Sequence, residues 1–222
     1  MSLGTPRLHL RVTDSTSERA KALAAAAPHG MLVTAAEQTA GHGRQGRSWS
    51  APPGEGLLMS LVLHDWPELL PLVAAVAVAE TCGPAARIKW PNDILIDDRK
   101  VSGILVEGRP QEGWAVLGIG VNVAVREFPA ELRDIAGSLG RSPADLEPFL
   151  AQLLANLERG LAAPPDTVIA AWRERDALLG RPIAWNGGAG VALGVDETGA
   201  LLVELADGSV TALNAGEVHL SR

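Results

Sequence analysis

An almost unbroken apolar segment from Gly56 to Leu63 constrains the fold of this 222-residue chain more than any other feature. It reads Gly-Leu-Leu-Met-Ser-Leu-Val-Leu, with no regular alternation of polar and apolar positions. A strand with one face in water alternates, because successive side chains point to opposite faces of a sheet. We therefore expect a strand that is covered on both faces.

Apolar periodicity and turn residues predict the other elements. The expected strands are 8–12, 31–35, 87–90, 101–107 and 114–123, and the expected helices are 14–28, 67–81, 144–161 and 167–179. After residue 180 five short segments alternate with glycine-rich turns, which predicts a small β-barrel. The expected division is a domain of residues 1–179 followed by one of residues 180–222.

The segment from residue 37 to residue 49 carries the strongest chemical signal. It contains three glycines and two arginines, namely Gly41, Gly43, Gly46, Arg44 and Arg47. Glycine permits backbone conformations that other residues resist, and arginine supplies fixed cations. Such a loop can fold N–H groups and guanidinium groups around a phosphate or a carboxylate. We interpret it as an anion-binding active-site loop, although a solvated surface loop would have a similar composition.

The same segment lies one substitution away from a phosphate-binding P-loop, because residues 41–48 read G-x-x-x-x-G-R-S. A P-loop must lead into a helix. Pro52, Pro53 and Gly54 follow almost at once and would break its first turn. A P-loop kinase is therefore disfavoured.

Three further segments combine charge with glycine or turn residues. They are Lys89-Trp90-Pro91-Asn92-Asp93, Lys100 with Gly103, and Gly118-Ile119-Gly120-Val121-Asn122. Glycine inside a strand often marks the close approach of a ligand or another backbone, so two such strands side by side could form the floor of a ligand slot. Taken singly, each segment is also explained as an ordinary strand end, a solvated lysine or a turn.

Composition restricts the class of protein. A net charge of −7 argues against a broad nucleic-acid surface. The single Cys82 lies in an apolar run, which fits a packing role in a reducing cytoplasm. The sequence contains no zinc-spaced Cys/His cluster and no apolar signal or membrane segment.

In their order and spacing these motifs resemble those of the biotin–protein ligases. The matching series is Ser15-Thr16, Gln38, Gly41-x-Gly43-Arg44-x-Gly46-Arg47-x-Trp49, Lys89-Trp90-Pro91-Asn92-Asp93, Lys100-x-x-Gly103-Ile104-Leu105-x-Glu107 and Gly118-Ile119-Gly120-x-Asn122. The resemblance extends from about residue 8 to the C-terminus. It implies an α+β fold: a mixed-sheet catalytic domain related to class II aminoacyl-tRNA synthetases, and a C-terminal SH3-like barrel.

The resemblance also implies a reaction. Members of that family join biotin to ATP as biotinyl-5′-AMP, with release of pyrophosphate and with Mg²⁺ present. They then pass biotin to one lysine of a biotin carboxyl carrier domain. It further implies a cytoplasmic protein, monomeric or homodimeric, that binds neither membrane nor nucleic acid. The first motif falls at residue 15, so we expect no N-terminal helix-turn-helix domain and no operator binding.

By matching position, the resemblance assigns roles to individual residues. The expected biotin-binding residues are Ser15, Thr16, Gln38, Gly41, His42, Gly43, Arg44, Lys100 and Gly103. The expected ATP-binding residues are Arg44, Arg47, Trp49, Lys89, Asn92, Lys100 and Asn122. Lys100, Arg44 and Asp93 are the expected catalytic residues, and Asn92 and Asp93 are the positions where Mg²⁺ could lie.

Two positions depart from the family pattern. His42 stands where the first arginine of a G-R-G-R-x-G-R run is expected, so one permanent cation becomes a titratable one. Ser17 stands where asparagine is common. The rival hypotheses are a lipoate or octanoate transferase of related fold, whose arginine-glycine motif is not evident, and a non-enzymatic biotin sensor, which would not need Lys89 or Lys100.

Overall fold

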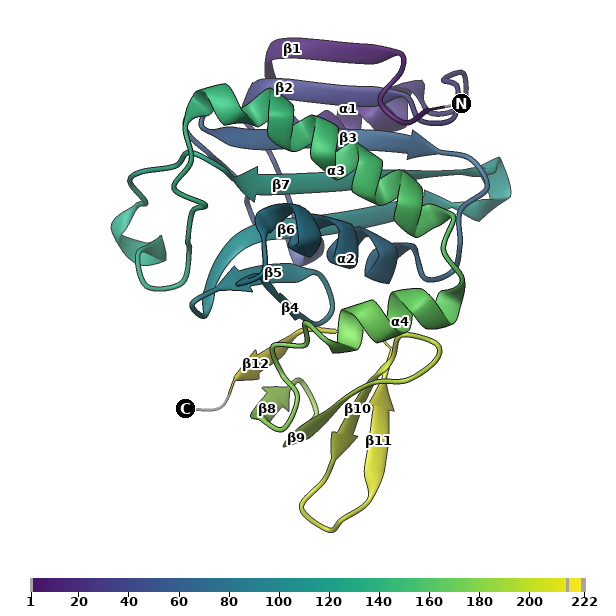
Figure 1. The fold of residues 1–222 in the computed structure, drawn as a ribbon, viewed down its shortest axis with the longest axis vertical. Coiled ribbons are helices and arrows are strands. Elements are labelled where there is room, and N and C mark those ends of the chain that lie inside the picture. Colours follow the sequence, from purple (N-terminus) through teal and green to yellow (C-terminus); the bar gives the residue numbers. More distant parts are fainter. Residues whose placement is uncertain (1, 215, 221–222) are drawn as a thin grey trace.

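The computed structural model describes residues 2–214 and 216–220. It contains two sheets, and the larger one is a mixed sheet of seven strands (Figure 1). The strands are β1 (Arg7–Thr13), β2 (Leu32–Gln38), β3 (Gly56–Leu63), β4 (Arg87–Lys89), β5 (Asp93–Ile96), β6 (Arg99–Arg109) and β7 (Trp114–Asn122). Their order is β1-β2-β3-β7-β6-β5-β4. Only β1 and β2 are parallel, and every other neighbouring pair is antiparallel.

The central strand β3 is covered on both faces, as its composition predicts. Met59 and Leu61 belong to the core shared with the helices α2 (Leu70–Cys82) and α3 (Leu146–Leu161). Val62 packs with Ala20 of α1 (Thr16–Leu23) on the opposite face. Each fully buried leucine or valine stabilises the fold by roughly 1.5–3 kcal/mol. Helices on both faces therefore account for the missing alternation (Figure 1).

The predicted helices are present, but their ends were partly wrong. The first ends at Leu23 rather than near residue 28, because Ala26 and Ala27 turn back onto the Leu23 carbonyl. The second and third begin at Leu70 and Leu146 instead of residues 67 and 144. The fourth, α4, spans Pro165–Arg173 rather than 167–179. It ends early because the next residues pair with β4, where Ile88 donates to the Arg175 carbonyl at 2.7 Å.

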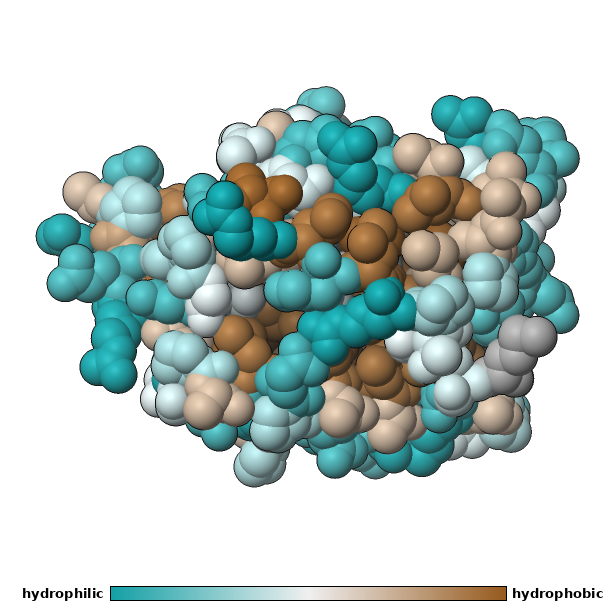
Figure 2. Space-filling view, turned by 90° about the horizontal axis from the view of Figure 1, so that it is seen from above, coloured by the Kyte–Doolittle hydropathy of each residue, from teal (hydrophilic) through white to brown (hydrophobic). Residues whose placement is uncertain are grey.

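The edge strand β1 lies at the top of Figure 1 and carries exposed charged residues. Arg7 makes two hydrogen bonds of 2.7 Å to Glu147 of α3, which ties this edge to the helix layer. Figure 2 looks onto the same side from above and shows a hydrophobic band interrupted by hydrophilic residues. Charged side chains on an edge strand oppose uncontrolled pairing with other sheets.

The C-terminal segment forms a separate five-stranded sheet. Its strands are β8 (Pro182–Trp185), β9 (Gly188–Val195), β10 (Leu201–Glu204), β11 (Val210–Leu213) and β12 (Val218–Leu220). The order is β11-β10-β9-β8-β12, with β11 and β12 at its two ends. Pairing between those ends is not observed in the described residues, so the expected closed SH3-like barrel stays a prediction.

The two sheets share one continuous hydrophobic core. Ile183, Val203 and Val218 of the C-terminal sheet pack into the cluster that also contains α2 and α3. Trp90 adds a direct bond, because its Nε1 donates to the Gly199 carbonyl at 3.0 Å. Cys82 is buried in the same core, and burial raises the pKa of its thiol to about 12. Among the described residues, no helix has the length and apolar character needed to cross a membrane.

Asp176, in the link between α4 and β8, is a buried carboxylate that destabilises the fold when it is charged. Its Oδ1 accepts from the Leu178 N–H at 2.7 Å, while its buried Oδ2 has no partner among the described residues. Burial raises the pKa of Asp176 above the ordinary value. The folded protein therefore retains the proton better than the unfolded chain does. Protonated Asp176 therefore favours the folded state. This contribution to the free energy of unfolding is lost as the pH rises from the ordinary pKa of aspartate through the raised pKa of the folded state.

We expect Asp176→Asn to increase the free energy of unfolding at pH 7 by about 1 kcal/mol, because it removes a buried charge. At about pH 3 the gain should vanish, since the carboxyl is then neutral in both states. Urea unfolding at the two pH values measures this difference. Asp134→Asn, at an exposed aspartate, is the control. An equal effect of Asp176→Asn at both pH values would contradict the explanation.

Candidate active site

A cavity of about 480 Å³ lies on the sheet face that carries α1, next to the N-terminal end of that helix. The ends of several elements meet here: β2 ends at Gln38, β3 begins at Gly56 opposite Asn122, and β7 ends at Asn122. Segments far apart in the chain therefore supply its walls. The cavity has a polar end, a glycine floor and a cationic end.

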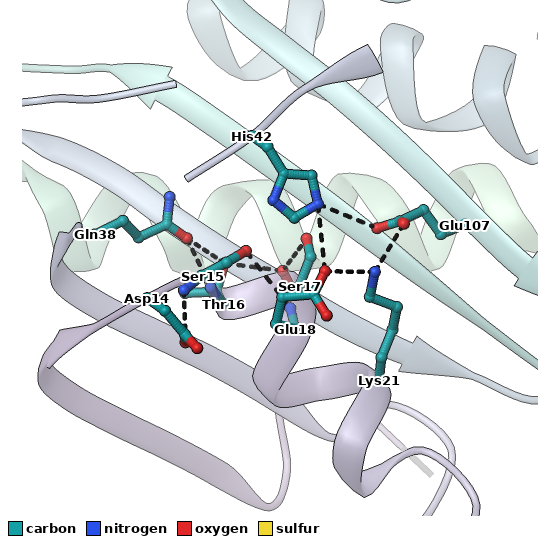
Figure 3. Close-up of polar contacts among 10 residues, drawn as sticks. Asp14, Ser15, Thr16, Ser17, Glu18, Lys21, Gln38, His42 and Glu107 are labelled. Carbon is teal, nitrogen blue, oxygen red and sulfur yellow. Dashed lines mark hydrogen bonds and ion pairs between the residues drawn. The ribbon is translucent and has the colours of Figure 1, made fainter. Parts of the chain in front are cut away.

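The polar end consists of hydroxyl and amide groups that fix one another. The backbone N–H and Oγ1 of Thr16 both donate to Gln38 Oε1, at 2.7 and 2.9 Å (Figure 3). Ser60 Oγ donates to Thr16 Oγ1 at 2.9 Å and lies 3.1 Å from Ser17 Oγ. Ser15 accepts from Glu18 N at 3.5 Å and caps α1. The Gln38 side-chain oxygen is thus committed to Thr16, and its amide nitrogen is left for the cavity.

The floor is made of glycines on two paired strands. Gly103 of β6 lies directly opposite Gly120 of β7, and Gly118 also lines the cavity. Added Cβ atoms would come within 2.4 Å of Trp49 at Gly120 and 2.6 Å of Ser17 Oγ at Gly118. Trp49 therefore reaches the sheet only because a side chain is missing there. Its indole Nε1 is buried and has no hydrogen-bond partner among the described residues.

The cationic end contains two lysines and the Asn92-Asp93 turn. Lys100 Nζ lies 2.6 Å from Asp93 Oδ1 and 5.6 Å from the Trp49 ring centre. Burial lowers the pKa of Lys89, and Lys100 and Arg47 lower it further, while Asp93 and Glu217 oppose the shift. Asn92 Nδ2 donates to the Ile104 carbonyl at 2.6 Å, which fixes the turn. Positive charge is thus concentrated beside two carboxylates, Asp93 and Glu217.

The glycine-arginine loop (residues 41–49) covers this end and is tied across its base. Gly43 N donates to the Arg47 carbonyl at 2.7 Å, and Trp49 N donates to the Gly41 carbonyl at 2.9 Å. Arg47 pairs at 2.5 Å with Glu217, which directly precedes β12. Arg44 has no ion-pair partner within the described part of the chain and lines the cavity. One arginine of the loop is therefore held, and the other is available to an anion.

Most of the residues that the sequence singled out meet at this cavity. Its lining includes Ser15, Thr16, Gln38, His42, Gly43, Arg44, Arg47, Trp49, Asn92, Lys100, Gly103 and Asn122. Lys89 and Asp93 instead line a narrow adjoining cleft together with Arg44 and Glu217. Gly41 lies behind the wall, where an added Cβ would come within 2.3 Å of Gln38 Nε2. Gly41 is not among the residues that line the cavity, and a direct contact between Gly41 and biotin stays a prediction.

Sequence reasoning missed one wall of the cavity. The segment after β7 contributes Phe128, Pro129, Glu131, Leu132, Ile135 and Ala136. It is held by backbone bonds from Lys100 N to the Ile135 carbonyl and from Gly137 N to the Lys100 carbonyl, both 2.8 Å. Asn122 Nδ2 also donates to the Gly137 carbonyl at 2.9 Å. The segment's sequence signal is the spacing of Phe128, Leu132 and Ile135, which recur at i, i+4 and i+7 as on one face of a helix.

Comparisons with known proteins agree with this site. The family described as "Biotin/lipoate A/B protein ligase family" matches residues 9–123, and "Biotin protein ligase C terminal domain" matches residues 179–221. The bifunctional ligase/repressor BirA of Bacillus subtilis is 39% identical over 93% of this chain and 71% of its own length. The biotin–[acetyl-CoA-carboxylase] ligase of Paracoccus denitrificans is 37% identical over 86% of this chain and 91% of its own.

A solved structure extends the similarity to the whole fold. The biotin protein ligase of Aquifex aeolicus, in complex with biotin and ATP, superimposes with a TM-score of 0.85. It is 29% identical and covers 98% of this chain and 99% of its own. The sequence match and the shared fold lead to the same assignment. This chain belongs to the biotin/lipoate A/B protein ligase family.

Proposed function

We propose that this protein is an ATP-dependent biotin–protein ligase. In the first step a biotin carboxylate oxygen attacks the α-phosphorus of ATP, and pyrophosphate leaves. In the second step the amine of an acceptor lysine attacks the acyl carbon, AMP leaves, and an amide bond forms with release of a proton. The acceptor is one lysine of a biotin carboxyl carrier domain.

The observation that carries this proposal is the placement of Lys100. Its ammonium group lies where the glycine floor meets the cationic end, beside Trp49 and Asp93. A carboxylate and an α-phosphate repel each other unless a cation lies between them. Lys100 and the free Arg44 can supply that charge from opposite walls. The remaining roles follow from position.

The polar end suits a cyclic urea, which offers two N–H donors and one carbonyl acceptor. Ser15, Thr16 and Gln38 present hydroxyl and amide groups there, and buried polar groups of a ligand require such partners. His42, Gly43 and Gly103 border the path from this end to Lys100. We propose that they contact biotin along its length, whereas Gly41 supports the loop from behind.

The nucleotide is proposed to bind at the cationic end. Trp49 and Asn122 would lie on the adenine side, with the missed segment around Phe128 as the opposite wall. Arg44, Arg47, Lys89 and Asn92 would contact the phosphates. Arg47 must exchange Glu217 for phosphate, and Lys100 must exchange Asp93 for the substrate anions. Asp93, once released, can orient the acceptor lysine.

Mg²⁺ is compatible with the residues present. One carboxylate, Asp93, and one amide oxygen, Asn92, stand beside the proposed phosphate site, and magnesium nucleotides need no more from the protein. Bound there, the ion would neutralise phosphate charge. Among the described residues there is no group of three or more His, Cys, Asp or Glu side chains able to hold a metal by themselves. The phosphates would therefore supply most of the ligands.

The proposal also covers the division into domains, the cellular compartment and the oligomeric state. We propose a catalytic domain of residues 1–179 and a C-terminal domain of residues 180–222. We also propose activity in the cytoplasm, as a monomer or homodimer, without binding to DNA or membrane. The buried Cys82 and the acidic net charge support this setting.

The decisive experiment is ATP–pyrophosphate exchange with Mg²⁺ and biotin, lipoate or octanoate in parallel reactions. Exchange stimulated by biotin alone is the expected result. Stimulation of exchange by lipoate or octanoate would instead indicate an enzyme that acts on lipoate or octanoate. Biotin binding without any exchange would favour a sensor.

We expect Lys100→Ala to lower the rate of biotin-dependent exchange by about ten- to hundredfold, because one charge-assisted contact to the reacting anions is lost. Single-turnover adenylate formation measures the effect, and the melting temperature reports on folding. Arg99→Ala removes a neighbouring exposed cation of β6 and should leave the rate unchanged. Normal adenylation by the Lys100 variant would remove the central assignment.

Gly120→Ala tests the glycine floor. The added methyl group would lie 2.4 Å from Trp49, so the indole must move away from the sheet. We expect the KM for ATP to rise by about tenfold, the scale of an overpacking cost. The matched control is Gly108→Ala in β6, where an added Cβ finds only ordinary contacts of 3.6 Å or more. If both variants raised the KM for ATP equally, the missing side chain at Gly120 would have no special role in nucleotide binding.

A further inference from the structure

His42 faces a small charged cluster formed by two other elements (Figure 3). Its Nε2 lies 3.5 Å from Glu18 Oε1 of α1 and 3.9 Å from Glu107 Oε2 of β6. Lys21 of α1 lies between the same two carboxylates, with Nζ 2.6 Å from Glu18 Oε1 and 2.8 Å from Glu107 Oε1. The histidine therefore lies within ion-pair range of both acids, and no hydrogen bond joins it to either of them among the described residues.

One oxygen of this cluster has no partner. Glu107 Oε1 accepts from Lys21, while Glu107 Oε2 is buried and makes no hydrogen bond among the described residues. A buried carboxylate oxygen without a donor is costly. His42 Nε2 is the nearby group that could become its donor, because a charged hydrogen bond of about 2.8 Å needs an approach of roughly 1 Å.

The groups around His42 carry an excess of negative charge. Glu18 and Glu107 contribute two negative charges and Lys21 one positive charge, so the cluster is −1 when His42 is neutral and zero when it is protonated. Within the described chain His42 lies within 4.0 Å of no further carboxylate, and Arg44 and Arg47 are the cations of its own loop. Protonation therefore turns a weak contact into an ion pair.

His42 is placed so that this ion pair would act on the whole loop. It bridges Ser48 across the base of the glycine-arginine loop, next to the bonds that tie Gly43 to Arg47 and Trp49 to Gly41. The far side of the loop is already held by Arg47 and Glu217. Glu18 belongs to the same helix as Thr16 and Ser17, which line the cavity. Drawing His42 toward Glu18 and Glu107 would thus close the loop over the cavity.

We propose that His42 is a positioning residue: its protonated imidazole pairs with Glu107 and Glu18 and holds the glycine-arginine loop closed over bound biotin. The proposal rests on the function proposed above. Arg47 carries a permanent charge, so only the His42 side of the loop loosens near neutral pH. The pairing needs a charged imidazole, and a histidine side chain is the one whose charge changes near neutral pH, so raising the pH should weaken it.

Biotin dissociation between pH 6 and 8.5, followed by stopped flow, tests the proposal. For the unmodified protein the rate should rise about fivefold with pH, the scale expected for a half-exposed ion pair. Biotin should dissociate slowly from the His42→Arg variant and rapidly from the His42→Gln variant, in both cases at every pH. His42→Arg should lose its advantage when combined with Glu107→Gln. His9→Gln, at an exposed histidine of β1, is the control and should keep the full pH dependence.

A ligand-free measurement separates this proposal from the proposed function. Amide hydrogen exchange of residues 41–49 at one fixed pH should be slower in His42→Arg than in His42→Gln, and the difference should vanish with Glu107→Gln. If that pattern appears but biotin does not bind, the positioning role survives and the proposed substrate fails. If biotin binds and the two His42 variants behave alike in both assays, the positioning role is wrong.

Discussion

The missing side chains on β6 and β7 are the constraint on which the site depends. Gly103 and Gly120 are paired across the two strands, and Gly118 follows on the same face of β7. Any Cβ at Gly118 or Gly120 would displace Ser17 or Trp49. β6 and β7 can lack side chains at these glycines because β3 and the helix layers bury enough apolar surface to stabilise the sheet. The cavity is therefore a feature of the sheet itself.

Charge is distributed to match this geometry. The chain as a whole carries −7, yet Arg44, Arg47, Lys89 and Lys100 gather around one end of the cavity. Two of these cations are held by acidic partners, Arg47 by Glu217 and Lys100 by Asp93. Such pairs allow like charges to lie close together, because each carboxylate offsets part of the repulsion. His42 likewise lies beside a carboxylate, 3.9 Å from the unpartnered Oε2 of Glu107.

The C-terminal sheet takes part in this arrangement and is not a passive appendage. Glu217 reaches the glycine-arginine loop, and Gly199 accepts a hydrogen bond from Trp90 beside the Asn92-Asp93 turn. Both contacts join segments more than 100 residues apart. They couple the position of the small sheet to the loop and to the turn that carries the proposed catalytic carboxylate. Fold and site are thus stabilised by some of the same contacts.

Much of the fold and the family could be predicted from the amino-acid sequence. The apolar run at 56–63 specified a strand covered on both faces, and the order of the glycine, arginine and lysine motifs indicated the family. These features are local, because periodicity, turn residues and motif spacing act over a few residues. Three features became apparent only in three dimensions: Arg47 pairs with Glu217, α4 ends at Arg173, and residues 128–136 form one wall of the cavity. The tertiary structure also set His42 beside an unpartnered Glu107 oxygen. Those outcomes depend on contacts between distant segments, and a pattern within one segment carries no information about which distant groups will face it.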